Sequence, residues 1–204
     1  MSIFLDIETS GLSPSHGAVI LSIGMIHDEG RLESPTSEFE IHITPTPEEW
    51  AQASEQALTV NGLTYEFLCE HGIPLKEAVR QVCDWLIERR VWLGTDVIGQ
   101  NPDFDFRFLN YFMGMDLLNT GFPANRSPTN VIEMAKELAE RDEKFRPISE
   151  TGRISFKGSN ISKALGLPPE PDVHRALAGA HACRQNYYGV VERLTRAKKR
   201  TIKI

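Results

Sequence analysis

The sequence predicts a mixed α/β domain, in which a three-strand antiparallel meander is followed by alternating strands and helices. Two apolar runs, residues 3–7 and 19–26, flank a segment rich in Gly, Ser and Pro that marks a turn between strands. A third run, residues 38–43, alternates apolar and polar residues until Pro45 stops it. Three strands joined in succession form the predicted meander.

Helical periods take over after the third strand. A helix is expected over residues 47–58, which begin with Pro and acids, and another over residues 75–87, where apolar side chains recur every three or four positions. The second of these helices should pack on the sheet. Residues 95–100 then predict a short buried strand, and residues 104–113 predict a helix.

The last third of the chain is predicted to be mainly helical. A short strand near residues 127–130 leads into a helix over residues 131–139. The polar segment 141–158 shows no clean period, which predicts a mobile loop or a small hairpin. Ser159 is expected to cap a short helix that ends at Gly166. A long final helix follows, with apolar residues at three-to-four spacing: Leu177, Ala180, Cys183, Tyr187, Val190 or Val191, and Leu194.

Length and composition indicate a single globular unit. The chain has 204 residues, 22 Lys and Arg against 28 Asp and Glu, a formal net charge of −6 and 41% hydrophobic residues. We expect one domain over residues 1–194 with a basic tail at 195–204, and disorder is excluded. No signal-peptide pattern and no apolar run near the roughly 18 residues of a spanning helix is present, so a cytoplasmic protein without membrane contact is expected. The acidic balance disfavours coating of nucleic acid by bulk charge.

The three cysteines are predicted to be reduced core residues. Cys69, Cys83 and Cys183 are odd in number, lack C-x-x-C spacing, and lie among apolar neighbours in helical patterns. This usage favours reduced thiols over a disulfide framework or a zinc site.

Two acids lie at the end of the first predicted strand. Asp6 and Glu8 are two residues apart, so their side chains point to the same face. Alone, the pair is compatible with solvated acids at a strand end. The apolar strand makes burial expected, and Thr9 and Gly11 supply a hydroxyl and a turn suited to gripping a chain end. Clustered carboxylates without cationic partners favour Mg²⁺ or Mn²⁺, which take oxygen ligands.

A second acidic site follows the strand predicted at residues 95–100. Pro102 fits the first turn of a helix, which places Asp105 early in that helix. Asp103 and Asp105 are also compatible with favourable charges at a helix N-terminus. If Asp105 meets Asp6 at the edge of the sheet, the two complete a metal cluster.

Three motifs together resemble a known family. Asp6-Ile7-Glu8-Thr9-Ser10-Gly11-Leu12, Asn101-x-x-Phe104-Asp105-x-x-Phe108-Leu109 and His174-Arg175-Ala176-Leu177 occur in the order and at the intervals of the DEDDh 3′-to-5′ exonucleases. That family includes proofreading exonuclease subunits of DNA polymerases, ribonuclease T and oligoribonuclease. The resemblance covers roughly residues 3–194 and implies a ribonuclease H-like fold.

The resemblance implies two-metal phosphodiester hydrolysis that releases mononucleotides from the 3′ end of single-stranded DNA or RNA. Asp6 would bridge two Mg²⁺ or Mn²⁺ ions, Glu8 would bind one of them, and Asp105 would bind the other. Ions about 4 Å apart stabilise both the attacking and the leaving oxygen. His174 would be the general base, a role that suits a neutral imidazole. Without the other motifs, His174 would read as an ordinary residue at a helix start.

Substrate contacts are expected around the first two motifs. Leu12 resembles the family position that contacts terminal bases, and Phe104 or Phe106 is suited to stacking, worth about 1–3 kcal/mol per base. For Phe104 and Phe108 a place in the core is favoured over stacking. The substrate-binding residues implied are Thr9, Gly11, Leu12, Asn101 and Phe104.

The sequence leaves open the role of the C-terminal tail, the type of nucleic acid and the oligomeric state. The run from Arg193 onward is basic without an acid, either as a solvated tail or as an added attraction for phosphates. DNA is slightly favoured over RNA by the resemblance alone, and monomer and homodimer both stay open.

The sequence departs from the family at one position. The family has an aspartate five residues after the histidine, where this chain has Gly179, which cannot bind a metal and costs a helix about 1 kcal/mol. Three explanations are open: a natural variant with water or a nearby acid in that place, a substitution made to trap a complex, and a lineage that lost the reaction. Asp172 and Asp103 are the nearest substitute carboxylates. The alternative function is a catalytically weakened or inactive nucleic-acid-binding module.

Overall fold

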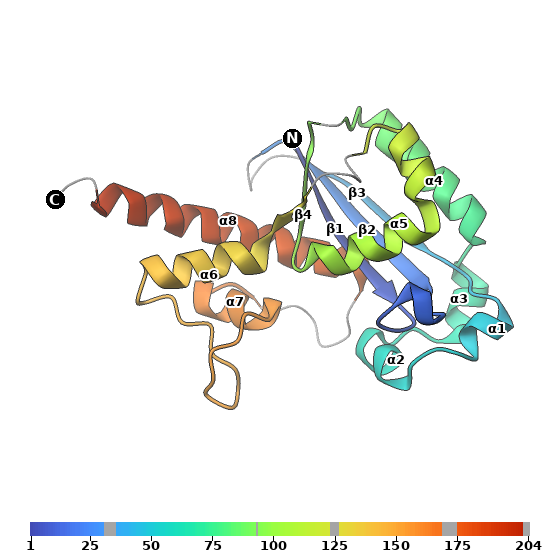
Figure 1. The fold of residues 1–204 in the computed structure, drawn as a ribbon, viewed down its shortest axis with the longest axis horizontal. Coiled ribbons are helices and arrows are strands. Elements are labelled where there is room, and N and C mark those ends of the chain that lie inside the picture. Colours follow the sequence, from blue (N-terminus) through green and yellow to red (C-terminus); the bar gives the residue numbers. More distant parts are fainter. Residues whose placement is uncertain (31–35, 93, 123–126, 169–174, 202–204) are drawn as a thin grey trace.

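A five-stranded mixed sheet forms the centre of the computed structural model, in the order β3-β2-β1-β4-β5 (Figure 1). The structure describes residues 1–30, 36–92, 94–122, 127–168 and 175–201, with the backbone alone for the last four. The strands are β1 (Ser2–Thr9), β2 (Ile20–Asp28), β3 (Thr36–His42), β4 (Asp96–Gly99) and β5 (Thr129–Asn130). The predicted mixed α/β class is confirmed.

The first three strands form the predicted meander. β1 pairs antiparallel with β2, with Asp6 opposite Gly24, and β2 pairs antiparallel with β3, with Ile23 opposite Ile41. β4 lies parallel to β1, and β5 lies parallel to β4. The carboxyl ends of β1 and β4 therefore meet at one end of the sheet, here called the carboxyl edge. Ligands of open α/β sheets bind outside such ends.

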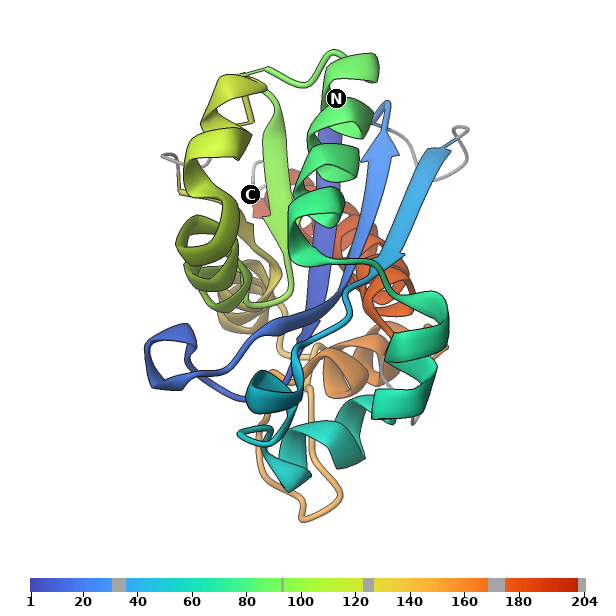
Figure 2. The ribbon, with the colours of Figure 1, turned by 90° about the vertical axis from the view of Figure 1, so that its right-hand side faces the viewer.

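Helices cover both faces of the sheet (Figure 2). α4 (Leu75–Glu88) and α5 (Pro102–Asn119) pack on one face, and α6 (Val131–Arg141) and α8 (Ala176–Thr201) pack on the other. Leu5 and Ile7 of β1 belong to the first core, whereas Phe4 belongs to the second, as the two-residue period of a strand requires. The predicted packing of the helix at 75–87 on the sheet is confirmed.

The single helix expected over residues 47–58 is wrong, because two caps divide it. α1 (Pro47–Trp50) begins at a capping box in which Thr46 and Glu49 satisfy each other's backbone N–H groups. Ser54 then caps α2 (Glu55–Asn61) by accepting from the Ala57 N–H. Gly62, with φ of 60°, ends α2 in the left-handed region before α3 (Tyr65–His71).

The later helices differ from expectation mainly at their ends. α5 runs beyond the predicted residue 113 and is kinked at Met113, where φ is −146°. Lys157 is the N-cap residue of α7 (Gly158–Leu165), so Ser159 lies inside the helix and the predicted cap is wrong. The predicted end at Gly166 is confirmed. Ile148 and Ile154 form an antiparallel bridge, so segment 141–158 contains the small hairpin.

Cys69, Cys83 and Cys183 form no disulfide bond, as predicted, but the prediction that all three are core residues is wrong. Cys183 is buried, but Cys83 is half-buried and Cys69 is exposed, because these two lie toward the outer faces of α4 and α3.

In the described part of the chain, no helix has both the length and the apolar content to cross a membrane. The boundary between a domain at 1–194 and a tail at 195–204 stays a prediction; α8 runs through it without a break.

Candidate active site

The candidate site lies at the carboxyl edge, where the first two acidic motifs meet. Asp6 and Glu8 are on β1, and Asp105 is in the first turn of α5, which follows β4. The Ile7 N–H donates to Asp105 Oδ1 at 3.1 Å, so Asp105 contacts the backbone between the two acids of β1. The hydrogen bond brings residues 98 positions apart into one site. A direct meeting of Asp105 with Asp6 stays a prediction.

Asp105 is a buried acid whose pKa is strongly shifted. Only 5% of its surface is exposed. Burial raises the pKa of the Asp105 carboxyl from 3.8 to about 8; hydrogen bonds from the backbone N–H groups of Asp105 and Ile7 oppose the rise, and the charge of Glu8 adds to it. Glu8 is itself 8% exposed. Two acids are therefore held near each other with little exposure to solvent. An added cation there would favour the ionised forms of both carboxyl groups.

Gly179 lies directly against Asp6. A Cβ atom at position 179 would lie 2.2 Å from Asp6 Oδ2 and 2.7 Å from its Cγ. A close approach of helix to sheet produces this contact, since a Cβ at Gly24 would lie 2.2 Å from the carbonyl carbon of Ala176. Position 179, where the family that the sequence resembles has its fourth acid, therefore lies beside Asp6. The Asp6 carboxylate occupies the space that a side chain at position 179 would need.

The turn after β1 is tied to its surroundings by hydrogen bonds. The Thr9 hydroxyl donates to the Gly11 carbonyl at 2.7 Å, and the Ser54 N–H donates to the Ser10 carbonyl at 2.7 Å. Gly11 permits a close approach to Ala18, whose Cβ would lie 3.2 Å from a Cβ at position 11. Leu12 is held outward, with 79% of its surface exposed. An apolar side chain thus stands in solvent beside the acids.

A cavity of about 240 Å³ lies between this turn, β1, α2 and α5. Of the residues that the sequence singled out, Glu8, Thr9, Gly11, Leu12 and Phe104 line it. Sequence reasoning missed the contribution of α2, because nothing in the pattern of α2 marks it as facing the first motif. The missed lining residues are Ser54, Gln56, Ala57, Val60 and Asn61.

Asn61 joins the cavity to both flanking motifs. Its side-chain amide donates to the Thr9 carbonyl at 3.2 Å, and its Oδ1 accepts from the Leu63 N–H at 3.0 Å. Arg175 donates to the Asn61 carbonyl at 3.2 Å. Asn61 is 1% exposed, so this buried residue fixes the turn, α2 and the start of α8 relative to one another.

The remaining predicted residues differ in where the structure places them. Asn101 and Asp103 are exposed at the start of α5, and Asn101 does not line the cavity. Phe106 is buried against Phe122, so it cannot stack on a base and that suggestion is wrong. Phe104 is half-buried and lines the cavity, and Phe108 is core as expected. His174 and Asp172 lie outside the described residues.

Comparison with known proteins was informative at the level of structure. No family model and no curated protein matches the sequence. Exonuclease I from Methylocaldum szegediense has a TM-score of 0.78 and 19% identity, covering 96% of this chain and 41% of its own. E. coli Exonuclease I in complex with a dA16 oligonucleotide has a TM-score of 0.77 and 16% identity, covering 100% of this chain and 43% of its own. The chain has the exonuclease I fold.

The likeness confirms the predicted ribonuclease H-like fold, and at these identities it shows the fold alone. The chain spans less than half the length of the exonuclease I structures it matches. A zinc-bound form of the E. coli protein with single-stranded DNA is among them, at a TM-score of 0.78 and 16% identity, covering 100% of this chain and 43% of its own.

The three acids at the candidate site carry oxygen atoms that suit a hard cation. Asp6, Glu8 and Asp105 offer only carboxylate oxygens, the ligands that Mg²⁺ and Mn²⁺ prefer. Among the described residues, no three His, Cys, Asp or Glu side chains stand in an arrangement that could already hold an ion. Metal binding at these acids is therefore a proposal.

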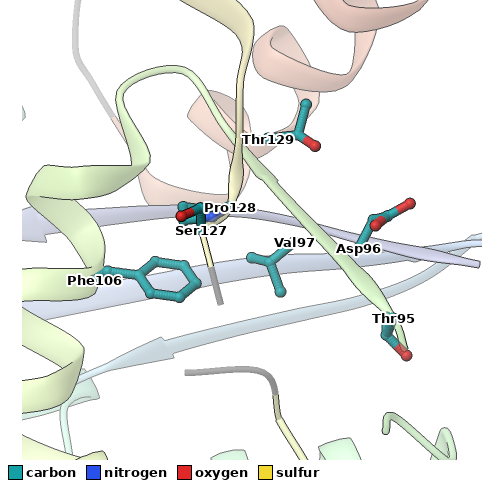
Figure 3. Close-up of a pocket in the computed structure, with 7 residues that line it drawn as sticks. All are labelled: Thr95, Asp96, Val97, Phe106, Ser127, Pro128 and Thr129. Atoms are coloured by element: carbon teal, nitrogen blue, oxygen red, sulfur yellow. The ribbon is translucent and has the colours of Figure 1, made fainter. Parts of the chain in front are cut away.

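A second cavity, of about 310 Å³, lies at the amino end of β4 (Figure 3). Thr95, Asp96 and Val97 line it from β4, and Ser127 to Thr129 line it from the segment entering β5. Of its seven lining residues, Asp96 alone carries a carboxylate. Glu8 is likewise the single carboxylate that lines the cavity beside the first motif, but that cavity is also lined by Ile7, whose N–H donates to the buried Asp105, so a second acid lies next to it. The cavity beside Glu8 is therefore the candidate active site.

Proposed function

We propose that the chain is a metal-dependent 3′-to-5′ exonuclease that releases mononucleotides from single-stranded nucleic acid. The hydrogen bond from Ile7 to Asp105 carries the proposal, because it unites the two acidic motifs beside an apolar cavity. The solved exonuclease I structures with dA16 and with dT13 oligonucleotides support single-stranded DNA as the substrate class.

The proposed mechanism assigns each side chain a separate task. Asp6 would bridge two ions, and Glu8 and Asp105 would each bind one of them. The ions supply Lewis-acid stabilisation of the attacking and leaving oxygens. His174 would accept the proton of the attacking water. Leu12, Val60 and Phe104 would hold the terminal base, while the Thr9 turn would hold the sugar.

A second candidate function is a binding module without catalysis, and Gly179 favours it. Since Gly179 has no side chain, one anionic ligand of the set that the family resemblance implies is absent. Such a module would bind single strands in the same cavity.

Hydrolysis of a labelled strand separates the two functions. In Mg²⁺ or Mn²⁺ the purified chain should shorten a 5′-labelled single-stranded DNA or RNA one nucleotide at a time, releasing mononucleotides, and it should leave the strand intact in a chelator. Asp6→Ala should lower the rate by at least about a hundredfold, because it removes the bridging ligand. Asp116→Ala, an exposed acid further along α5, is the matched control and should keep the rate. Equal rates for Asp6→Ala and the parent would disprove the site, and binding without hydrolysis by the parent would favour the module.

A further inference from the structure

We propose that a second face of the molecule, built by the hairpin at residues 146–157 and by α6, binds the single strand upstream of its 3′ end. The inference rests on the proposed function and extends it: the candidate site would hold the terminal nucleotide, and this face would hold an unpaired base and its phosphates several nucleotides away. Within the described residues, three observations support it: a cavity, a concentration of positive charge, and the anchoring of the hairpin at the carboxyl edge.

A cavity of about 310 Å³ lies between α6 and the hairpin. Ile154, which is exposed, and Phe156, which is half-buried, form the reachable part of its apolar wall, and the buried Phe145 and Pro147 lie behind them. Lys136 and Arg146 lie at it with one acid, Glu140. Ligand pockets are commonly about 300–1,000 Å³, mostly apolar with a few polar groups. An unpaired base fits this chemistry, since any base can stack on an apolar or aromatic surface.

Apolar side chains extend this surface beyond the cavity. Ile148 and Ile154, paired across the hairpin, are 43% and 58% exposed. Polar side chains at these two positions would be solvated without cost. The two neighbouring exposed isoleucines therefore point to an apolar contact with a ligand.

The charge of the hairpin is opposite to that of the molecule. The hairpin at residues 146–157 holds three cations against the single acid Glu150, in a chain with a net charge of −6, and Lys144 precedes it next to Asp142 and Glu143. The positive charge is confined to the hairpin, because α6 holds three acids against two cations. Among the described residues none of these cations has an ion-pair partner, and all four are exposed: Lys144, Arg146, Arg153 and Lys157. Unpaired cations beside an apolar surface complement a single strand, which presents phosphates and bases in alternation.

The hairpin is anchored close to the candidate site. Asn186 of α8 donates to the Gly158 carbonyl at 3.2 Å and to Gln100 Oε1 at 3.5 Å, and it accepts from the Ser162 hydroxyl at 2.9 Å. Asn186 is fully buried. Lys157 is therefore held near the residues that join β4 to α5. Figures 1 and 2 both show the hairpin, between α6 and α7, at the end of the molecule where α2 lies.

Binding of strands of two lengths tests the proposal. The full chain is titrated in a chelator with fluorescein-labelled dT16 and with dT4, by anisotropy. Arg146→Glu with Arg153→Glu should weaken dT16 binding tenfold or more and leave dT4 within twofold, because only the longer strand reaches the hairpin. The control is Lys76→Glu with Arg90→Glu, which makes the same change in net charge. Lys76 is exposed on α4 and Arg90 is exposed just after it, on the face of the sheet opposite to α6. This variant should bind both dT16 and dT4 within threefold of the parent.

A second variant tests the cavity without changing charge. Ala139→Phe, on the α6 wall, should weaken dT16 binding at least threefold by filling the space, again without effect on dT4. The proposal is overturned if dT16 binding by both hairpin variants stays within twofold of the parent, if dT4 and dT16 weaken equally, or if the parent does not bind dT16 more tightly than dT4. Loss of hydrolysis with intact length-dependent binding would reject the proposed catalysis alone, whereas hydrolysis with no hairpin effect would reject this inference alone.

Discussion

Gly179 is the residue at which the candidate site departs most from the family it resembles. From the sequence alone, an aspartate at position 179 is expected to be sterically tolerable, because a residue inside a helix needs no positive φ. The structure corrects this expectation: a Cβ at position 179 would lie 2.2 Å from Asp6 Oδ2, so the Asp6 carboxylate must turn away first. Two carboxylates in contact also repel one another unless a cation lies between them.

We therefore predict that Gly179→Asp destabilises the metal-free protein and raises hydrolysis only when metal is present. In Mn²⁺ the rate should rise tenfold or more, if the added ligand contributes about 1.4 kcal/mol to the transition state. Gly179→Ala is the matched control, since it introduces the same Cβ without a carboxylate and should lower or abolish activity. Hydrolysis by Gly179→Asp no faster than by Gly179→Ala would show that this position does not bind the metal.

The buried carboxyl of Asp105 predicts a pH dependence of stability. Its pKa is raised to about 8, so the folded protein keeps a proton there that the unfolded chain loses near pH 4. This group stabilises the fold most below pH 4, and its contribution is lost as pH rises toward 8.

Asp105→Asn should remove that dependence in metal-free buffer. The substituted amide still accepts the Ile7 N–H through its oxygen, and it cannot ionise. Urea unfolding should show the parent losing stability between pH 4 and 8, and the variant exceeding it at pH 8 by at least about 1 kcal/mol. Asp103→Asn, exposed two residues earlier, should retain the slope of the parent. An unchanged slope in Asp105→Asn would contradict the assignment.

At the scale of elements, the approach of α8 to the sheet decides which residues meet in the site. Gly24 of β2 makes that approach possible, since a Cβ there would lie within 2.4 Å of backbone atoms of Ala176 and Leu177. Backbone atoms cannot turn aside as a side chain can. The first turn of α8, and with it Gly179, is therefore positioned by the absence of a side chain on β2.

Gly24→Ala should accordingly displace α8 and destabilise the protein by roughly 1–3 kcal/mol, the cost of overpacking a core. Gly114→Ala is the control: it lies in α5, and the nearest atom to its Cβ would be 3.8 Å away. That substitution should be neutral or stabilise by up to about 1 kcal/mol, because Ala favours a helix over Gly. Denaturant unfolding measures both, and equal stabilities would mean that α8 adapts freely.

At the scale of the whole molecule, the candidate site predicts the polarity of degradation. The turn at residues 9–12, α2 and α5 surround the cavity beside Glu8, which suits a chain end. A linear single strand should shorten from a free 3′ hydroxyl, whereas a circular strand of the same sequence should persist. Gel analysis of both over one time course measures this, with 3′-phosphorylated linear strand as the control. Cleavage of the circle at the linear rate would exclude an exonuclease.

The strands and the order of the motifs follow from the sequence alone. A two-residue period places Asp6 and Glu8 on one face of β1 wherever β1 lies, and Pro102 starts α5 three residues before Asp105. These are local rules, so they predicted the meander and the elements that carry Asp6, Glu8 and Asp105, whose roles stay a prediction. They also predicted one helix over residues 47–58, because periodicity cannot weigh two competing caps.

Contacts between distant elements were decided by the tertiary structure. The sequence carries no local sign that α2 lines the cavity through Val60 and Asn61, or that α8 presses Gly179 against Asp6. It also marked Phe106 as a stacking candidate, although packing against Phe122 buries it. Residue type and spacing set the chemistry available to this protein, since they act along the chain. Packing set which of these groups share a site, because burial and close approach depend on segments that are remote in sequence.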